Sequence, residues 1–589
     1  MKSILTRLFG TSIALILATS FACDGARDAF GEQPPALVSK DDGATTDCTE
    51  GVRCSRDLRS VVSACDESKI VSTCPPDQGC ADGSCVPACD AAANNGASVG
   101  CEFVALRPAP QETPNMIERQ GACFAAFIAN TWTTPVHVEA EYGDAPLDLV
   151  RSGRIVRTTE SGVTYDPFDG DLQPEDVVVL FLEQRFDTVV PCPRGIEAAR
   201  RVPSGIFGTG RGDSYRIKTS APVSAYSIFP YGGGRSKTSS ATLLLPIATW
   251  KTDYIVANAW ERGAIGPGAP TTQIVAAEDD TEVTIVGSVR IQGGPAVESA
   301  EGGVPQTYRM RRGELLQFTQ DQMLSGSLLS ANKKVGLWGG HECLFIPADK
   351  LACDQSTRQL PPVQAWGHEY VAVPYLSRRP DKTPEVYFYR VMAAADGTTL
   401  TYEPSRPPDA PASLSKGDSA LFTTNEPFIV NSQDESHPIA VYEYMSGSTY
   451  ETSPDYDGDP EFSYVVPAAQ YLDNYVFFVD PTYRNSQLVV VRSRRPGSDF
   501  EPVTLDCAGP LEDWTPIGTA GIYEYTRFYV SKDGIPRTVG NGKCGAGRHN
   551  MSSRGAFGVT VWGTDYATSY AYPGGAAIRP INNTQAIVH

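Results

Sequence analysis

Two pairs of residues that often bind metals lie close together in the middle of the chain. His341 is followed by Glu342, and His368 is followed by Glu369. Histidine and glutamate at short spacing can ligate zinc. A zinc hydrolase of the helical type places two histidines four residues apart on one helix face, whereas the residues around these pairs are typical of strands and loops. We therefore expect hydrogen-bonded histidines at strand ends.

The segment SPDYDGDPEF carries carboxylates at alternate positions. Oxygen ligands at this density suit calcium, which would stiffen the loop. The spacing does not complete an EF-hand pattern, so a solvated acidic turn is the simpler interpretation. Calcium is the one cofactor that the sequence suggests, and its candidate ligands are Asp455, Asp457, Asp459 and Glu461.

Patterns for other catalytic classes are not found in a suitable context. No Gly-x-Ser-x-Gly motif lies on an expected strand-to-helix turn, where a hydrolase places its nucleophile. The glycine-rich segments GGGRS and GTGRGDS are not followed by an expected helix, which argues against a phosphate site. A polysaccharide hydrolase that uses paired carboxylates across a β cleft remains an alternative, because such pairs have no sequence motif.

One phrase occurs three times: a proline, an aromatic residue four positions later, and a tyrosine before an apolar run. The aromatic residues are Trp250, Trp366 and Tyr471. Similar segments follow each phrase in similar order over roughly 105 to 120 residues, and an earlier copy lacks the phrase. A catalytic role would not need the same residues in every copy. We interpret the three aromatics as core residues of repeated modules or of the junctions between them.

The segments between the phrases predict the fold class. They are short, rich in β-branched and aromatic residues, and bounded by Gly, Asp or Pro, which is typical of strands. We expect an all-β region over 102–589, built of tandem β-sandwich-like modules. A β-propeller is the alternative, but its blades repeat every 40 to 50 residues or so. The expected repeats cover about 121–235, 243–345, 358–448 and 464–575.

The N-terminus indicates export. Residues 1–22 combine Lys2 and Arg7 with a short apolar core and small residues, as in a signal peptide. Cys23 follows at once, and we expect it to carry a lipid that anchors the chain to a bacterial outer membrane or cell surface. Ordinary cleavage without a lipid is the alternative. Residues 23–47 lack periodicity and predict a flexible tether.

Residues 48–101 contain eight of the fifteen cysteines. A segment this short cannot bury enough apolar surface, so disulfides would supply its stability. A zinc site is disfavoured, because an exported chain meets oxidising conditions and no paired Cys-x-x-Cys occurs here. Asp82-Gly83 predicts a hairpin turn, whereas the disulfide connectivity stays open.

One stretch resembles a known family. Residues 335–374 read VGLWGGHECLFIPADKLACDQSTRQLPPVQAWGHEYVAVP, which is similar to the central signature of the IgG Fc-binding protein N-terminal domain family. Residues 458–478 and 556–575 resemble its third repeat and its closing strands, so the resemblance covers roughly 121–580. It implies a noncatalytic binding or adhesion role, with no catalytic residues to transfer, and does not imply that this chain binds IgG.

The resemblance also bears on the remaining cysteines. Cys343 and Cys353 occupy matching positions in the family, which implies that they are bonded. Once the eight cysteines of the small domain close among themselves, the other expected pairs are Cys507 with Cys544 and Cys123 with Cys192.

The formal net charge of −20 disfavours nucleic acid, because both surfaces would repel each other. We therefore expect a noncatalytic surface lipoprotein that meets the membrane through its lipid and binds a protein or glycan ligand. An envelope protein whose repeats serve as a spacer is a further alternative, beside the hydrolase.

Overall fold

The computed structural model describes residues 51–66, 69–111, 121–159, 162–379, 381–451 and 453–586. Cys23, the expected signal peptide and the expected tether lie outside these residues. The described chain is almost entirely β, as the strand-rich composition predicts. It is arranged in several antiparallel sheets, and the alternative of a β-propeller is wrong, since no closed barrel or propeller forms among the described residues.

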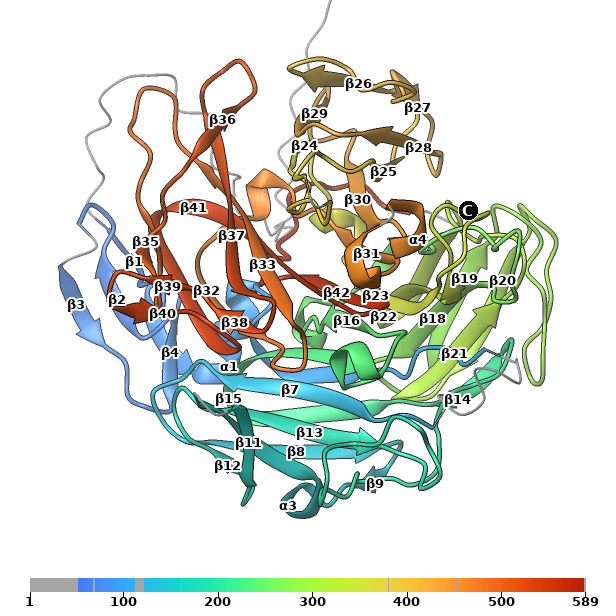
Figure 1. Cartoon of the computed structure of the whole chain (residues 1–589), viewed down its shortest axis with the longest axis horizontal. Helices are drawn as coiled ribbons and strands as arrows, with labels where there is room; N and C mark the ends of the chain where they lie inside the picture. Colours follow the sequence, from blue (N-terminus) through green and yellow to red (C-terminus); the bar gives the residue numbers. More distant parts are fainter. Residues whose placement is uncertain are drawn as a thin grey trace, which may run out of the picture. The chain divides into compact units, whose positions relative to one another are not determined.

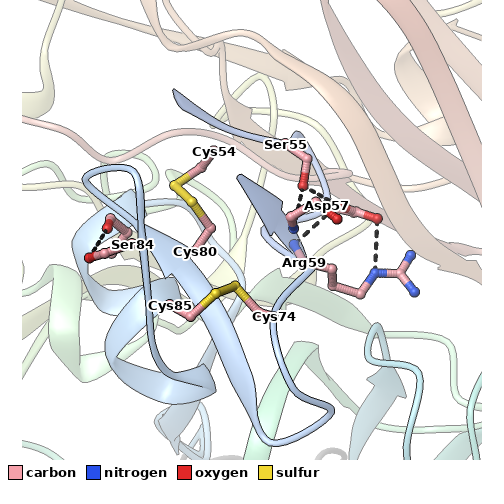
Figure 2. The surroundings of a disulfide bond; sticks show 10 residues. Cys54, Ser55, Asp57, Arg59, Cys74, Cys80, Ser84 and Cys85 are labelled. Carbon is pink, nitrogen blue, oxygen red and sulfur yellow. Dashed lines mark hydrogen bonds and ion pairs between the residues drawn. A yellow bond between two sulfur atoms is a disulfide. The ribbon is translucent and has the colours of Figure 1, made fainter. Parts of the chain in front are cut away.

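The cysteine-rich segment forms two small sheets and one helix. Cys54 bonds to Cys80, Cys74 to Cys85 and Cys89 to Cys101, and the first two bonds lie side by side in Figure 2. The elements are β1 (Val52–Cys54), β2 (Ser60–Ser63), β3 (Ile70–Thr73), β4 (Gln78–Ala81), β5 (Ser84–Pro87) and α1 (Ala88–Asn95). Few apolar side chains are buried here, and half-cystines make up most of the small core.

Turns in this segment follow local chemistry. Asp82 and Gly83 join β4 to β5, and both have positive φ angles, as a tight hairpin requires. The carboxylate of Asp57 accepts hydrogen bonds from the Ser55 hydroxyl (2.6 Å) and the Arg59 amide (3.1 Å), which closes the β1–β2 turn (Figure 2).

Four repeats follow, and they share one plan. Each repeat has, near its C-terminal end, a strand that we call the long strand. The first half of the long strand pairs with two strands, and its second half pairs with two different strands. The long strand therefore bends from one sheet of the repeat into the other, and each repeat is a two-sheet module. The long strands are β15 (Tyr215–Phe229), β22 (Leu328–Leu344) and β41 (Gly547–Asp565), and repeat 3 has β29 (Phe428–Ser432) and β30 (Ile439–Met445) in this place.

Repeats 1 and 2 are joined by a shared strand, because β14 of repeat 1 pairs with β21 of repeat 2. The other elements of repeat 1 are β6 (Gly100–Ala105), β7 (Phe124–Asn130), β8 (Val136–Tyr142), β9 (Ala145–Pro146), α3 (Leu149–Ser152), β10 (Gly153–Thr159), β11 (Gly162–Pro167), β12 (Asp171–Leu172), β13 (Val177–Glu183), β14 (Gly210–Asp213), η1 (Gly233–Arg235) and β16 (Ser240–Leu243). Those of repeat 2 are η2 (Ile247–Thr249), β17 (Lys251–Ile255), β18 (Pro270–Ala276), β19 (Thr281–Val286), β20 (Pro305–Met310), β21 (Glu314–Thr319) and β23 (Asp354–Leu360).

Repeats 3 and 4 repeat the plan, and a single apolar cluster extends across all four repeats. Repeat 3 adds η3 (Val363–Ala365), β24 (Glu369–Ala372), β25 (Tyr387–Ala393), β26 (Thr398–Glu403), β27 (Ser413–Leu414), β28 (Ser419–Thr424), α4 (Ser448–Glu451), η4 (Pro454–Tyr456) and β31 (Glu461–Tyr464). Repeat 4 adds η5 (Ala468–Gln470), β32 (Leu472–Val479), β33 (Asn485–Ser493), β34 (Val503–Leu505), β35 (Gly509–Pro510), β36 (Thr515–Ile517), β37 (Tyr523–Lys532), β38 (Ile535–Pro536), β39 (Thr538–Val539), β40 (Gly542–Lys543) and β42 (Thr568–Pro573).

The repeated phrase forms the entry of repeats 2, 3 and 4. Its proline precedes a single 3-10 turn (η2, η3 or η5), and the aromatic residue ends that turn. The tyrosine four positions later then donates a hydrogen bond to the carbonyl at the joint, the point where the long strand changes partners. These bonds join Tyr254 to Val335 (2.8 Å), Tyr370 to Ile439 (2.6 Å) and Tyr475 to Phe557.

The phrase aromatics pack beside the same joint. Trp250 and Trp366 are 1% and 2% exposed, whereas Tyr471 is half-buried between two core clusters. A Cβ on Gly336 would lie 2.7 Å from the Trp250 ring, and one on Gly558 would lie 2.5 Å from the Tyr471 ring. Glycine at these joints therefore makes room for the aromatic residue. Tyr471 is thus less buried than its two counterparts.

The last strand of each repeat contacts the last strands of other repeats. We call β16, β23, β31 and β42 the junction strands; β16 contacts β23 and β42, and β31 contacts the same two (Figure 1). Polar side chains fill this buried junction: the Arg358 guanidinium pairs with Glu461 at 2.9 Å, and Ser356 donates to the same carboxylate at 2.9 Å. The first and fourth repeats are therefore in direct contact.

Within the described residues, no helix has both the length and the apolar character needed to cross a bilayer.

Candidate functional site

Four loops that lead into the junction strands meet on one surface. These junction loops are residues 230–239, 345–353, 446–451 with 453–460, and 566–567. The Gly447 amide donates to the Ile346 carbonyl (2.9 Å), and the Ala567 amide donates to the Tyr456 carbonyl (2.8 Å). Since every repeat contributes one loop, this surface is where the four repeats present side chains together.

Two tyrosines stand out on the junction loops. Tyr456 is 53% exposed and Tyr566 is 41% exposed, and their rings form an edge-to-face pair with centroids 5.9 Å apart. The ammonium group of Lys237 lies 5.0 Å from the centre of the Tyr566 ring. Exposed aromatic rings beside a cation are typical of binding surfaces.

A groove of about 860 Å³ lies beside this pair, between repeats 1 and 4. We call it the 1–4 groove. Its lining includes Tyr165, Arg194, Tyr231, Arg235 and Tyr566. The Tyr165 and Tyr231 hydroxyls are hydrogen-bonded to each other, and burial raises the pKa of Tyr165 to about 12, so both phenols are neutral at physiological pH.

A second groove of about 680 Å³ lies between repeats 3 and 4, and we call it the 3–4 groove. Tyr525, Arg527 and Tyr529 alternate along β37, so their side chains share one face of the sheet. The Arg527 guanidinium lies 5.5 Å from the centre of the Tyr525 ring. On the floor, Arg378 is buried and paired with Glu385 at 2.6 Å, which fixes that side chain.

The structure does not bring the expected calcium ligands together. Asp455 and Tyr456 have positive φ angles in a tight turn, so the segment is not extended and the carboxylates diverge. Asp457 accepts from the Asn485 amide (3.0 Å), Asp459 accepts from the Ser448 hydroxyl (2.9 Å), and Glu461 pairs with Arg358. Burial raises the pKa of Asp459 to about 6. These four carboxylates therefore do not converge on one site within the described residues.

The histidine pairs also form no metal centre. His341 is fully buried at the end of β22, where Nδ1 accepts from the Cys343 amide (3.0 Å) and Nε2 lies 3.1 Å from the Glu261 carbonyl. Burial lowers the pKa of His341 to about 3, so the ring stays neutral. In the described part of the chain, three potential ligands converge at Asp506, Cys507 and His549, but the Cys507 sulfur is in a disulfide.

Three disulfides connect segments of the repeats. Cys343 bonds to Cys353, Cys507 to Cys544, and Cys123 to Cys192. The first closes the junction loop 345–353, and the last anchors the loop after β13, which lines the 1–4 groove. The Cys343–Cys353 and Cys123–Cys192 bonds thus hold loops at the candidate site, which reduces the entropy lost when a ligand binds.

The sequence did not single out the groove residues. Arg194, Arg235 and Tyr566 lie in different loops, separated by up to several hundred positions. The segment GGGRS, which contains Arg235, is not followed by an expected helix, and the sequence therefore argues against a phosphate site there. It is instead a glycine turn, in which Gly233 has a positive φ and packs directly on the Thr482 carbonyl.

The sequence of the chain matches one known protein family. A sequence model of one family, described as IgGFc binding protein, matches residues 240–563. The match covers more than half of the chain and extends from β16 into β41, which includes three of the four junction strands. No curated protein matches the chain.

Proposed function

Because the chain belongs to the IgGFc binding protein family, we propose that it is a noncatalytic binding protein, exported and anchored to the cell surface through a lipid on Cys23. The observation that carries the proposal is the junction-loop surface, where two grooves flank an exposed tyrosine pair. The ligand is a protein or a glycan, presented to the cell from outside.

The anchor and the binding surface belong to separate parts of the chain. Cys23 is the first residue of the tether expected over 23–47, whereas the grooves are built by repeats 1, 3 and 4. Loss of the lipid should therefore release the chain from membranes without changing its fold or its ligand affinity.

The function is tested with cells that display the full chain or its Cys23→Ser variant. We expect the full chain in the membrane fraction and the variant in the medium, with equal melting temperatures. Cells with the full chain should bind at least one class of surface among immobilised mucin, immunoglobulin G and arrayed glycans, and cells with the variant should lose that binding. A Ser20→Ala variant serves as a control that keeps Cys23.

Three outcomes would reject parts of this proposal. A Cys23→Ser chain that stays with membranes contradicts the lipid anchor. An anchored chain that binds none of the three surfaces contradicts the binding role and favours the spacer alternative. Release of reducing sugar ends from arrayed glycans would favour the hydrolase alternative instead.

A further inference from the structure

We propose that the 1–4 groove is the ligand site, and that it binds an acidic oligosaccharide whose carboxylate or sulfate groups meet Arg194 and Arg235. This inference rests on the proposed binding function and names the site and the ligand class. The groove is lined by residues of repeats 1 and 4, so the site exists because these two repeats are in contact.

The first argument is charge. Arg194 and Arg235 are both exposed, and neither forms an ion pair or a side-chain hydrogen bond with the described residues. Asp565 is the one carboxylate in the lining, and it is already paired with Arg484 at 2.7 Å. The groove therefore carries an uncompensated positive charge on a chain whose net charge is −20. An anionic ligand gains attraction here that the rest of the surface does not offer.

The 3–4 groove provides the contrast. Arg378, Arg379 and Arg484 line it but already pair with Glu385, Glu451 and Asp565. The remaining basic side chains are outnumbered by carboxylates in the same lining, namely Lys382, Arg527 and Lys532 against Glu426, Asp455, Asp457 and Asp533. An anion is thus favoured in the 1–4 groove and not in the 3–4 groove.

The second argument is the type of donor. A guanidinium group presents a rigid fork that bonds a carboxylate or a sulfate through two parallel N–H groups. Arg235 extends from the glycine turn and Arg194 from the loop that Cys192 anchors, so the two approach the groove from different segments. Two such groups from different segments of one groove suit a ligand with repeated acidic groups.

The third argument is the aromatic lining. Tyr566 leaves 41% of its surface exposed at the groove, and Tyr456 supports its edge. An aromatic ring with a polar hydroxyl offers an apolar face and a hydrogen-bonding tip, as the two faces and the rim of a sugar ring require. Tyr165 adds a further hydroxyl at the groove, bonded to the Tyr231 hydroxyl.

The fourth argument is size and rigidity. A groove of about 860 Å³ lies in the range of small-ligand pockets, and such a concave site suits a few linked sugars better than the broad surface of a folded protein. Its walls are fixed: Gln184 accepts from the Cys192 amide at 2.7 Å, and the Cys123–Cys192 bond anchors the same loop. Preorganised walls lower the entropy cost of binding.

The test uses the full chain and isothermal titration calorimetry. The probes are a heparin-derived hexasaccharide, a galacturonate hexasaccharide, neutral maltohexaose and hexaglutamate, which separate sulfate from carboxylate and sugar from peptide. We expect at least one acidic hexasaccharide to bind, more weakly at high salt because the attraction is screened. Maltohexaose should not bind.

Two double variants locate the site. Arg194→Gln with Arg235→Gln should weaken binding of the acidic hexasaccharide at least about tenfold, since two charge-assisted bonds are lost. Arg406→Gln with Arg495→Gln removes the same charge from exposed arginines outside both grooves and should leave affinity unchanged. All four arginines are exposed, so the variants should have the same melting temperature as the wild type.

Several results would overturn the inference: equal binding of maltohexaose, tighter binding of hexaglutamate than of both acidic sugars, or an unchanged affinity in the Arg194→Gln, Arg235→Gln variant. Absence of binding to every probe would also overturn it. If cells with the full chain still adhere to one of the three surfaces in that case, the site assignment fails while the proposed function stands.

Discussion

Repeats 2 and 3 follow the same plan but treat the long strand differently. In repeat 2, β22 continues through its joint at Val335, whereas in repeat 3 the chain leaves β29, passes through residues 433–438 and re-enters at Ile439. Pro438 stands at the break, where it cannot donate a ladder hydrogen bond. The joint still receives a tyrosine hydroxyl in both repeats. In these two repeats, the tyrosine of the entry phrase therefore marks the joint whether or not the long strand is continuous.

The largest expected effect comes from removing the phrase tryptophans. Trp250→Ala and Trp366→Ala should each lower the free energy of unfolding by about 3–5 kcal/mol, because each empties a fully buried site. Tyr471→Ala should cost less, since that ring is half-buried. Melting temperatures of the full chain measure all three. Equal losses at the three positions would contradict the difference in burial.

The protonation of Glu443 in repeat 3 can be tested by measuring stability as a function of pH. Counted from the joint, Glu443 corresponds to Gly339 in repeat 2 and Val561 in repeat 4. Burial raises the pKa of Glu443 to about 8, from 4.5 when unfolded. The folded state keeps its proton longer, so this contribution to stability is complete below pH 4.5 and is lost as the pH rises through 8.

Denaturant titrations of the wild type and Glu443→Gln between pH 5 and 8 check this sign. We expect the glutamine variant to gain relative stability with pH, by up to about 4 kcal/mol over the interval. Because Asp459 and Asp480 also have raised pKa values, the difference between the two proteins is the quantity to compare. A constant difference across the interval would mean that Glu443 titrates normally.

A smaller effect is expected from filling the space at the joint. Gly336→Ala should destabilise the chain by about 1–3 kcal/mol, because its Cβ would lie 2.7 Å from the Trp250 ring. Repeat 3 has Ala440 directly after its joint residue, so Ala440→Gly is the matched reverse change and should not relieve any clash. The melting temperatures of both variants test this prediction. An unchanged melting temperature for Gly336→Ala would show that the Trp250 side chain can move.

The smallest expected effect comes from removing the phrase tyrosine hydroxyls, and it tests the comparison between repeats 2 and 3 directly. Tyr254→Phe and Tyr370→Phe each remove one hydroxyl, at a cost of about 0.5–1.5 kcal/mol. If the phrase fixes the joint, Tyr370→Phe should cost more, because no continuous strand supports Ile439. The free energy of unfolding of the two variants is measured by denaturation. Equal losses would indicate that the pairing of the sheets, and not the phrase, fixes the joint.

The sequence predicted what local patterns control. Short segments rich in β-branched and aromatic residues, bounded by turn residues, indicated an all-β fold of modules, and the Pro-x-x-x-Trp/Tyr phrase lies at the entry of repeats 2 to 4. For the acidic run, the sequence favoured a solvated turn, but Asp459 and Glu461 are buried. Alternate spacing places side chains on one face only in an extended chain, and Asp455 and Tyr456 have positive φ angles. Arg194 and Arg235 could not be paired in advance, because no periodicity relates two loops of different length.

Contact between the first and last junction strands limits how this architecture can vary. In an open solenoid, each repeat touches its neighbours in sequence, so units can be gained or lost at the ends. Here β16 touches both β23 and β42, and β31 touches the same two, so no junction strand is left at an open end. An inserted fifth module would separate partners that now share a buried polar centre. Repeat number is therefore constrained by packing, and diversification is left to the loops.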